Sequence, residues 1–339
     1  MKLLIVTQKV NKEDPILGFF HRWIEEFAKH VEVVTVICLE KGDYSLPENV
    51  KVLSLGKEEG NSALEYLKRF YSHIWNERGN YDAVFVHMNP EYAILGGPLW
   101  RLWGKRMGLW YVHKAVNPRI WLAEKLANVV FTSAPESFQL KSKKVQYVGH
   151  GIDAEQYKFS PMVSEKTPLL YVGRITRIKN LYAIVKGTKG WPLTLVGEPV
   201  TEDDRKYKKE IESLAEEVDA DLKWFGAVPN YKMSEIYQTH SASINASPDG
   251  GMDKSVLESL ASGCPAFVKN TAFRNVYGEN FSTFNFQTAE DLEQKITNFL
   301  ERDDKEQVAE SLSRKIHSEY GVGSVISKII SGISNEDSR

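Results

Sequence analysis

Several features that mark particular classes of protein are scarce in this chain of 339 residues. It has two cysteines, Cys38 and Cys264, each inside an apolar stretch, so a disulfide framework or a cysteine-rich zinc site is excluded and two buried thiols are expected. The formal net charge is only -2, which offers nucleic acid no general attraction. The chain has no repeat period and no low-complexity tract.

The N-terminus also lacks a long hydrophobic run. The opening run, MKLLIVT, meets Gln8 and Lys9 and is too short for a signal peptide or a membrane span, so it predicts a first β-strand. Together with the low cysteine content, which fits a reducing compartment, this favours a cytoplasmic protein.

What the chain does contain is a soluble globular composition, with 42% hydrophobic and 26% charged residues. Its length exceeds what one core usually organises, so two domains are expected. In the first half, short apolar runs predict buried strands: KLLIVT, HVEVVTVICL, NVKVLSL, YDAVFVH, LWYVH, NVVFTS and KVQYVG. Helical spacing between them, as in 19 to 28 and 62 to 75, predicts a parallel sheet with helices on both faces.

A polar stretch at 153 to 167, DAEQYKFSPMVSEKT, predicts a linker, after which the alternation restarts. The strands expected there are PLLYVGR, WPLTLVGE, DLKWFGAV, SASINAS and CPAFVKN. The tail from 304 to 333 predicts one or two helices broken near Gly321, followed by a frayed NEDSR. We therefore predict an α/β chain with Rossmann-like domains at 1 to 153 and 154 to 320, facing a cleft, and a tail, 321 to 339, that packs back towards the first domain.

The first motif with chemical character is YVGRITRIKN at 171 to 180. A strand ends at Gly173 and Arg174, and Lys179 follows at an expected helix start, so both cations lie at a strand's carboxyl end. A charge-assisted hydrogen bond of about 1.5 to 3 kcal/mol outweighs the helix N-terminus, at about 0.3 to 1 kcal/mol, so the side chains would dominate phosphate binding. The alternative is a pair of solvated loop cations.

The second motif is SPDGGMDKSVLESLASGCPAFV at 247 to 268. Its glycine-containing loop opens a helix, and the loop amides of 250 to 253 would point at an anion. Glu258 lies in the second turn, and Gly263 marks the helix end. Because Ser255 and Glu258 stand at capping-box spacing, Glu258 is alternatively a simple N-terminal helix carboxylate.

The segment from about 168 to 270 resembles the donor half of glycosyltransferase family 4 (glycosyl transferases group 1). The strings that carry the resemblance are GR and KN, then LVGE, FGAVPNYKMSEIYQTHSASINAS and DGGMDKSVLESLASGCPAFV. The resemblance implies the GT-B fold, with 1 to 153 as the acceptor-binding domain and 154 to 320 as the nucleotide-sugar-binding domain. It also implies a diphosphate held by Arg174 and Lys179, ribose hydroxyls on Glu258, and base contacts from main chain near Val228. The donor-binding set it implies is Gly18, Gly173, Arg174, Lys179, Val228, Gly250, Gly251, Met252, Ser255, Val256 and Glu258.

One position departs from the family pattern. A second glutamate that contacts the transferred sugar usually stands eight positions before the one matching Glu258, and here that position is Gly250. Asp249 is the nearest replacement, and Asp253 is a weaker one. The departure leaves room for a protein that binds nucleotide without turnover.

The first half resembles the family loosely. Gly18 stands where the family has a glycine-rich turn near the donor phosphates. His113 closes the expected strand LWYVH, where the family often has a histidine near the transferred sugar, and His87 closes YDAVFVH. Both would face the cleft, and each is alternatively a structural histidine.

The window 101 to 150 is basic, with four tryptophans interleaved. Its cations are Arg101, Lys105, Arg106, Lys114, Arg119, Lys125, Lys141, Lys143 and Lys144, and its neighbouring tryptophans are Trp100, Trp103, Trp110 and Trp121. This composition is typical of a surface resting on anionic lipid at the inner face of a membrane, which would suit a lipid-linked acceptor. The alternative is core tryptophans beside a solvated face.

The acidic strings at 202 to 204 and 302 to 304 lie at expected helix starts, where acids stabilise the first turn, so no metal site and no cofactor is expected. The resemblance implies a retaining, metal-independent hexosyltransferase that moves a sugar from a nucleotide-diphosphate donor, UDP before GDP, to a glycan or lipid-linked acceptor, as in polysaccharide biosynthesis. Its expected catalytic groups are Arg174, Lys179, His113 and Asp249. The alternatives are a nucleotide-sugar epimerase and a non-catalytic GT-B nucleotide-binding subunit.

Overall fold

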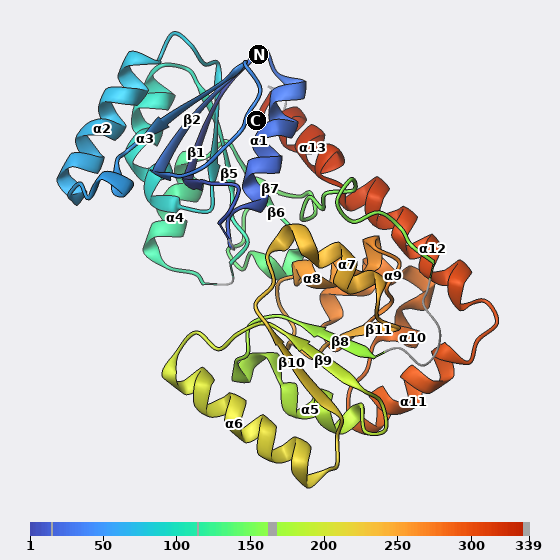
Figure 1. Ribbon diagram of the computed structural model, residues 1–339. Helices are drawn as coiled ribbons and strands as arrows, with labels where there is room; N and C mark the ends of the chain where they lie inside the picture. The colour runs from blue at the N-terminus through green and yellow to red at the C-terminus, as the bar shows by residue number, and fades with distance from the viewer. Residues whose placement is uncertain (15, 114, 162–167, 335–339) are drawn as a thin grey trace. The chain divides into compact units, whose positions relative to one another are not determined.

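A computed structural model describes the chain except for residues 15, 114, 162–167 and 335–339 (Figure 1). Part of the expected linker, Lys114 of the basic window and the NEDSR tail therefore lie outside the described residues. The chain forms two compact units, Met1–Gly151 with Val322–Arg339 (unit 1) and Ile152–Gly321 (unit 2).

Unit 1 is built on a seven-stranded sheet in which every neighbouring pair is parallel. Its strands are β1 Lys2–Val10, β2 Val33–Lys41, β3 Val50–Ser54, β4 Ala83–His87, β5 Arg106–Trp110, β6 Val129–Thr132 and β7 Val145–Tyr147. The strand order β3-β2-β1-β4-β5-β6-β7 reverses direction between β1 and β4, which confirms the predicted doubly wound sheet.

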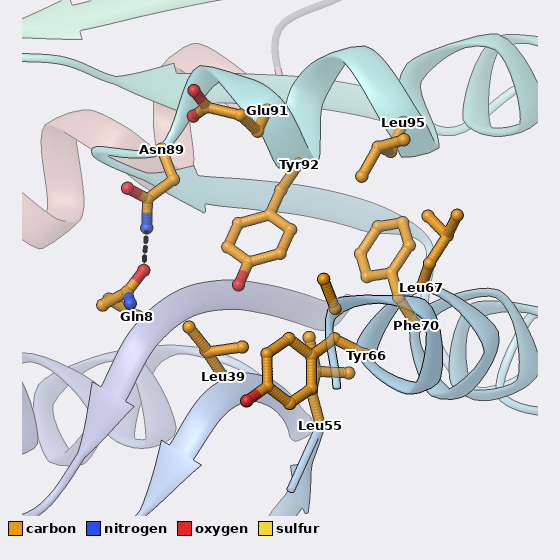
Figure 2. Close-up of a pocket in the computed structure, with 11 residues that line it drawn as sticks. Gln8, Leu39, Leu55, Tyr66, Leu67, Phe70, Asn89, Glu91, Tyr92 and Leu95 are labelled. Atoms are coloured by element: carbon orange, nitrogen blue, oxygen red, sulfur yellow. Dashed lines mark hydrogen bonds between the residues drawn. The ribbon is translucent and has the colours of Figure 1, made fainter. Parts of the chain in front are cut away.

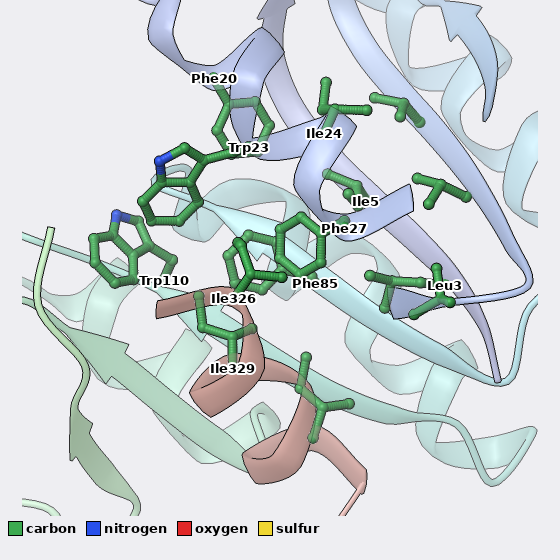
Figure 3. Close-up of a cluster of buried hydrophobic side chains, with 14 of the residues drawn as sticks. Leu3, Ile5, Phe20, Trp23, Ile24, Phe27, Phe85, Trp110, Ile326 and Ile329 are labelled. Atoms are coloured by element: carbon green, nitrogen blue, oxygen red, sulfur yellow. The ribbon is translucent and has the colours of Figure 1, made fainter. Parts of the chain in front are cut away.

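Helices cover both faces of this sheet. They are α1 Phe19–His30, α2 Ala63–Asn76, α3 Pro90–Leu102, α4 Pro118–Leu126 and α13 Val322–Ser334, with 3-10 turns at Lys57–Glu59 and Pro135–Ser137. Residues of α1 and α13 share one buried cluster with the sheet, in which Phe27 lies beside Phe85 and Trp23 beside Trp110 (Figure 3). Residues of α2, α3 and α4 form the core on the other face. The C-terminal helix is thus part of unit 1.

The first helix shows why the sequence folds this way. Phe20, Trp23, Ile24 and Phe27 recur at intervals of three and four residues, so they form one stripe, and all four are buried. Burial of each such side chain contributes about 1.5 to 3 kcal/mol, far more than the helix propensity of any residue. Packing of this stripe therefore determines where α1 lies.

Unit 2 has a smaller sheet of the same kind. Its strands are β8 Leu169–Val172, β9 Leu193–Val196, β10 Leu222–Gly226, β11 Ala242–Asn245 and β12 Ala266–Val268, in the order β10-β9-β8-β11-β12 and all parallel. Its helices are α5 Leu181–Gly187, α6 Glu202–Glu217, α7 Met233–Gln238, α8 Lys254–Ala261, α9 Arg274–Tyr277, α10 Phe281–Phe284, α11 Ala289–Leu300 and α12 Lys305–Lys315. Short turns lie at Arg177–Lys179 (η3), Asn230–Lys232 (η4), Thr271–Phe273 (η5), Gly278–Asn280 (η6) and Ile316–Tyr320 (η7).

Each run predicted as a strand contains or overlaps one, but some boundaries differ; β5 begins at Arg106, before the run LWYVH. The strand expected to close at His113 ends at Trp110, since the last pair of the β5 and β6 ladder joins Trp110 to Phe131. The tail forms α12 and α13 with a π-helical turn before Gly321, so the predicted break is confirmed. The acidic string at 202 to 204 begins α6, where Asp204 completes a capping box with Thr201.

Candidate active site

The two main motifs meet in unit 2, where its strand order reverses. Strands β8 and β11 are neighbours at this point, and the connections leaving their carboxyl ends diverge to opposite sides of the sheet. Such a divergence leaves a crevice at the strand ends, which is where open α/β sheets bind ligands. Arg174 follows β8, and the loop that opens α8 follows β11.

Close main-chain contacts hold the end of β8. Gly173 donates its N–H to Val196 O at 3.0 Å, and Gly197 donates to Gly226 O at 2.8 Å. A Cβ on Gly197, whose φ is +139°, would lie 1.9 Å from Gly173 O, so only glycine allows this approach. Tyr171 donates its hydroxyl to Arg174 O at 2.8 Å. The main chain of Arg174 is therefore well anchored.

The Arg174 side chain itself is exposed. Within the described part of the chain, its guanidinium forms neither a hydrogen bond nor an ion pair. It therefore offers an uncompensated positive charge at the carboxyl end of the central strand.

Lys179 lies in a different environment. It ends η3, and the next residue, Asn180 with φ +49°, is the N-cap of α5, so Lys179 stands directly before the start of that helix, as expected. Its Nζ lies 2.7 Å from both carboxylate oxygens of Asp253 and 3.2 Å from Ser247 Oγ. Lys179 is thus joined to the loop after β11, across the point where the strand order reverses.

Asp253 is the centre of this polar cluster. Its Oδ2 also accepts hydrogen bonds from Asn245 Nδ2 at 2.7 Å and from Ser247 Oγ at 2.6 Å. Burial alone would raise the pKa of its carboxyl, but the charge and hydrogen bonds of Lys179 and the two polar neighbours outweigh burial and hold that pKa below its usual value. Asp253 is therefore an ionised carboxylate at neutral pH.

Glu258 is buried in the second turn of α8. The helix begins at Lys254 with Asp253 as its N-cap, so the capping-box alternative for Ser255 and Glu258 is wrong. Tyr237 donates its hydroxyl to Glu258 Oε2 at 3.5 Å, and Lys254 Nζ lies 3.9 Å from Oε1. Burial raises the pKa of Glu258, while Lys254 and hydrogen bonds from neighbouring polar groups oppose that rise.

Two neighbours of Glu258, Tyr157 and Asn230, were not among the expected site residues, although Asn230 lies in one of the strings that carry the family resemblance. Tyr157 accepts a hydrogen bond from Asn230 Nδ2 at 3.0 Å, and the hydrogen bonds of both residues to Glu258 lower its pKa. Tyr157 belongs to the stretch interpreted as linker, although it is buried. The sequence signal for it was the presence of two aromatic residues, Tyr157 and Phe159, in a mostly polar stretch.

The glycine loop before α8 is held by the next connection along the chain. Asp249 Oδ1 accepts from Thr271 N at 2.7 Å and from Thr271 Oγ1 at 2.9 Å, so its carboxylate stabilises the start of η5. Asn270 donates to Gly251 O at 3.0 Å. Of the remaining donor-binding candidates, Gly250, Met252 and Val256 are buried, whereas Ser255 and Val228 are half-buried.

The candidates Gly18 and His113 belong to unit 1. Gly18 precedes α1 in a tight turn, where a Cβ would lie 2.5 Å from Asp14 O. His113 is exposed three residues beyond the end of β5, and its Nδ1 accepts from Ala115 N at 3.0 Å. His87 is buried, stacks on Phe20 with ring centroids 3.9 Å apart and contacts Thr7 Oγ1, so it is a core histidine.

Much of the basic window has a structural role. Arg101 and Lys144 donate to the carbonyls that end α4, such as Leu126 O at 3.1 Å and Ala127 O at 2.8 Å. Lys105 and Arg106 likewise donate to main-chain carbonyls, of Tyr81 and Ile333. Trp100 and Trp110 are core residues, whereas Trp121 is exposed. Lys141 and Lys143 remain exposed cations of the window.

Neither a metal cluster nor a membrane-spanning helix is found in the described part of the chain. No three or more His, Cys, Asp or Glu side chains of the described residues gather as metal ligands. None of the helices of the described residues is both long and apolar enough to cross a bilayer.

The whole chain shares its fold with solved two-domain enzymes. It matches Anabaena HepE in complex with UDP with a TM-score of 0.75, at 14% identity over 98% of this chain and 100% of that one. Sucrose-phosphate synthase from Thermosynechococcus elongatus matches with a TM-score of 0.74, at 13% identity over 97% of both chains. A glycosyltransferase from Rickettsia africae matches with a TM-score of 0.75, at 12% identity over 99% of both chains. The fold is therefore GT-B.

A family model matches most of unit 2. Residues 166–302 match the model described as glycosyl transferases group 1, whereas no curated protein matches the chain in sequence. The matched segment includes Arg174, Lys179, Asp253 and Glu258. Unit 2 therefore carries a glycosyl transferases group 1 domain, which supports transferase activity, and the whole chain has the GT-B fold. Membership of family 4 in particular stays a prediction.

Proposed function

We propose that this chain transfers a sugar from a nucleotide-diphosphate sugar to a glycan or a lipid-linked acceptor, with retention of anomeric configuration. The observation that carries the proposal is that Arg174 and the 250 to 253 loop follow the neighbouring strands β8 and β11, which Lys179 and Asp253 join, with Glu258 buried in the helix that follows. This arrangement offers one exposed cation, the main-chain amides of a glycine-containing loop and one buried carboxylate, which are groups that can bind a nucleotide diphosphate.

The donor diphosphate would bind Arg174 and the amides around Gly251. Arg174 is exposed, and an arginine pairs readily with two phosphate oxygens at once. The charge of Lys179 is already balanced by Asp253, so Lys179 would act as an oriented hydrogen-bond donor more than as a source of net charge. Negative charge grows on the leaving diphosphate as the glycosidic bond breaks, and fixed donors aimed at it stabilise the transition state.

The ribose would bind Glu258. An ionised carboxylate accepts hydrogen bonds from two neighbouring hydroxyls, and the side chains of Lys254 and Tyr237 hold this carboxylate from its own unit. We infer a reaction through an oxocarbenium-like state in which the departing phosphate oxygen helps to deprotonate the acceptor. We also propose that donors from the protein, namely Arg174, Lys179 and the loop amides, take the place of a metal ion at the diphosphate.

UDP is the nucleotide we favour over GDP. HepE, whose fold this chain shares, was solved with UDP, with UDP and glucose, and with UDP-glucose. Main chain near Val228, directly after β10, would contact the base.

A non-catalytic nucleotide-binding subunit is the second candidate. The family glutamate that contacts the transferred sugar is replaced by Gly250. Both nearby carboxylates are engaged elsewhere, Asp249 with Thr271 and Asp253 with Lys179. Such a protein would bind nucleotide tightly and transfer no sugar.

The first experiment is thermal unfolding with UDP, GDP and ADP, each at about 100 times a plausible dissociation constant, where a true ligand adds about 2.7 kcal/mol of stability. We expect UDP to stabilise the chain and Glu258→Ala to abolish that effect. Glu216→Ala on the exposed face of α6 is the control and should keep it. Absence of stabilisation by any nucleotide would contradict the proposal.

The reaction itself is tested with UDP-sugars. Product formed with an acceptor would separate a transferase from a non-catalytic subunit, and sugar-nucleotide isomers formed without an acceptor would instead identify an epimerase. Proton NMR of the first-formed product should show the retained anomer. An inverted anomer would overturn the assignment of mechanism.

We also propose a cytoplasmic location and a peripheral contact with the inner face of the membrane. Lys141 and Lys143 are exposed, whereas Lys105, Arg106 and Lys144 donate to main-chain carbonyls and would destabilise unit 1 if changed. The double variant Lys141→Gln/Lys143→Gln should therefore weaken sedimentation with anionic vesicles without loss of stability. Unchanged sedimentation would remove the proposed contact.

A further inference from the structure

Unit 1 contains a pocket of about 500 Å³ at the carboxyl ends of its central strands. Gln8 of β1, Leu39 of β2 and Asn89, which follows β4, form its floor, and residues of α2 and α3 form its walls (Figure 2). Its volume is that of a small-molecule site, and its position beside the reversal of strand order between β1 and β4 is where open α/β sheets bind ligands.

Most of the lining is apolar. Leu67, Leu95, Phe70 and Tyr66 of α2 and α3 cover the end of the pocket between the helices, and Leu39 and Leu55 add apolar surface from the strand side. A sugar buried there would leave several hydroxyls without partners, at a cost of about 1 to 3 kcal/mol for each group. This end therefore suits a hydrocarbon chain and disfavours a glycan.

The opposite end is polar. Asn89 Nδ2 donates to Gln8 Oε1 at 2.9 Å, so these two amides fix each other's orientation. The Tyr92 hydroxyl lies on the same side of the pocket (Figure 2), and no hydrogen bond to it is recorded among the described residues. The Tyr92 oxygen is not among the fully buried polar atoms that lack a hydrogen-bond partner, and Tyr92 lines the pocket. Its hydroxyl is therefore accessible from the pocket and can bind a ligand hydroxyl.

The outer face of α2 continues the apolar lining. Leu64, Leu67, Tyr71 and Trp75 recur at intervals of three and four residues and are all exposed. Leu67 belongs to both this stripe and the pocket. An exposed apolar stripe that leads into an apolar pocket indicates a ligand whose chain is longer than the pocket.

We propose that this pocket binds the hydrocarbon chain of a lipid-linked acceptor, with the acceptor's polar head beside Gln8, Asn89 and Tyr92. The inference rests on the proposed function, because it assumes that the chain transfers a sugar to an acceptor. It names the acceptor class as an amphipathic alcohol and not a free glycan.

The test is calorimetric titration of the full chain with methyl, hexyl and octyl β-glucoside below the critical micelle concentration, without nucleotide. If the alkyl group of the glucoside is buried in the pocket, each methylene adds about 0.8 kcal/mol to the binding free energy. Octyl glucoside should therefore bind about 15-fold more tightly than hexyl glucoside. Methyl glucoside should give no measurable binding. Equal affinity for hexyl and octyl glucoside would overturn the proposal.

Variants locate the binding. Leu67→Glu places a charge at the pocket wall, and Leu122→Glu on α4 is its control, since the two leucines are 36% and 39% exposed. We expect loss of octyl glucoside binding in the first variant alone. Should Leu67→Glu fail to fold, Ala63→Trp fills the pocket from an exposed helix position and should have the same effect. Binding that survives in the folded pocket variant, or is lost equally in the control, would contradict the proposal.

Tyr92→Phe tests the polar end. Removing one neutral hydrogen bond should weaken octyl glucoside binding about 2- to 12-fold while the hexyl-to-octyl ratio stays the same. An unchanged affinity would remove the head-group assignment. Stabilisation by UDP, measured on the same variants, reports on unit 2 and should be unaffected, so failure of the pocket is distinguishable from failure of the proposed transferase activity.

Discussion

Lys179 and Asp253, which are 74 residues apart, form a bidentate ion pair with Nζ 2.7 Å from each carboxylate oxygen. The pair joins the turn after β8 to the loop that opens α8, the two segments that we assign to the donor diphosphate. Because Asn245 and Ser247 also donate to Asp253, the loop is held in place before any ligand binds. The loop is therefore preorganised by the Asp253 carboxylate.

The energy of this pair can be measured with a double-mutant cycle. Lys179→Met leaves Asp253 charged and mostly buried, so we expect it to destabilise unit 2 by about 1 to 3 kcal/mol, less than for a fully buried pair because both side chains remain about a quarter exposed. Lys179→Met/Asp253→Asn should recover part of that loss. Urea unfolding of the four proteins gives the coupling, and strictly additive effects would show that the pair contributes nothing.

The same carboxylate predicts a pH dependence. The pKa of Asp253 is depressed in the folded chain, so its contribution to stability is fully present above the unfolded pKa of 3.8 and is lost as the pH falls through the lower folded pKa. The stability difference between the natural chain and Asp253→Asn should therefore be constant between pH 5 and 7 and shrink below about pH 4. Urea midpoints of both proteins over this range check the prediction. A difference that grows towards low pH would contradict it.

Arg174→Ala should reduce turnover more than donor affinity. The exposed guanidinium would act mainly on charge that develops in the transition state, and removal of one such donor typically costs about 100- to 1000-fold in kcat. We expect a smaller rise in the dissociation constant for UDP, measured by calorimetry. Arg177→Ala is the matched control, because this nearby arginine is paired with Glu210 at 2.6 and 2.8 Å. Equal losses in the two variants would rule out a specific role for Arg174.

Gly197→Ala should disrupt the end of β8. The new Cβ would lie 1.9 Å from Gly173 O, a main-chain atom that cannot move without displacing Arg174. Gly190→Ala is the control: Gly190 also has positive φ, but a Cβ there meets nothing within 4 Å, so the cost should be about 1 to 2 kcal/mol of backbone strain alone. We expect a larger fall in the thermal midpoint for Gly197→Ala and loss of stabilisation by UDP. Equal falls would show that the close approach is relaxed at little cost.

The two cysteines should report separately on the two units. Burial raises the pKa of both Cys38 and Cys264 from 9.0 to about 12, which lowers the thiolate fraction at pH 8 about 1000-fold. We expect neither thiol to react with a disulfide reagent in the folded protein. In Cys38→Ala, labelling should follow the unfolding of unit 2, and in Cys264→Ala that of unit 1. Rapid labelling of either thiol under native conditions would show that its unit opens locally.

Local sequence patterns predicted most of the fold. Each strand is an apolar run bounded by turn residues, and β-strands of a doubly wound sheet are buried on both faces, so the pattern appears without knowledge of the neighbours. The end of β5 was misplaced because Tyr111 and Val112 continue the apolar run, whereas the ladder with β6 stops at Trp110. Where a strand ends depends on its partner strand, which no local pattern contains.

The sequence by itself determined the two doubly wound sheets and the order of Arg174, Lys179 and Glu258 along the chain, since strand periodicity and motif spacing are local properties. Only the tertiary structure decided that Asp253 binds Lys179, that Asp249 is held by Thr271 and that Tyr157 lies beside Glu258. Each of these contacts joins residues that are 22 to 101 positions apart, as for Asp249 with Thr271 and Tyr157 with Glu258. Their partners are selected by how the connections pack at the strand ends, and packing is a property of the folded chain alone.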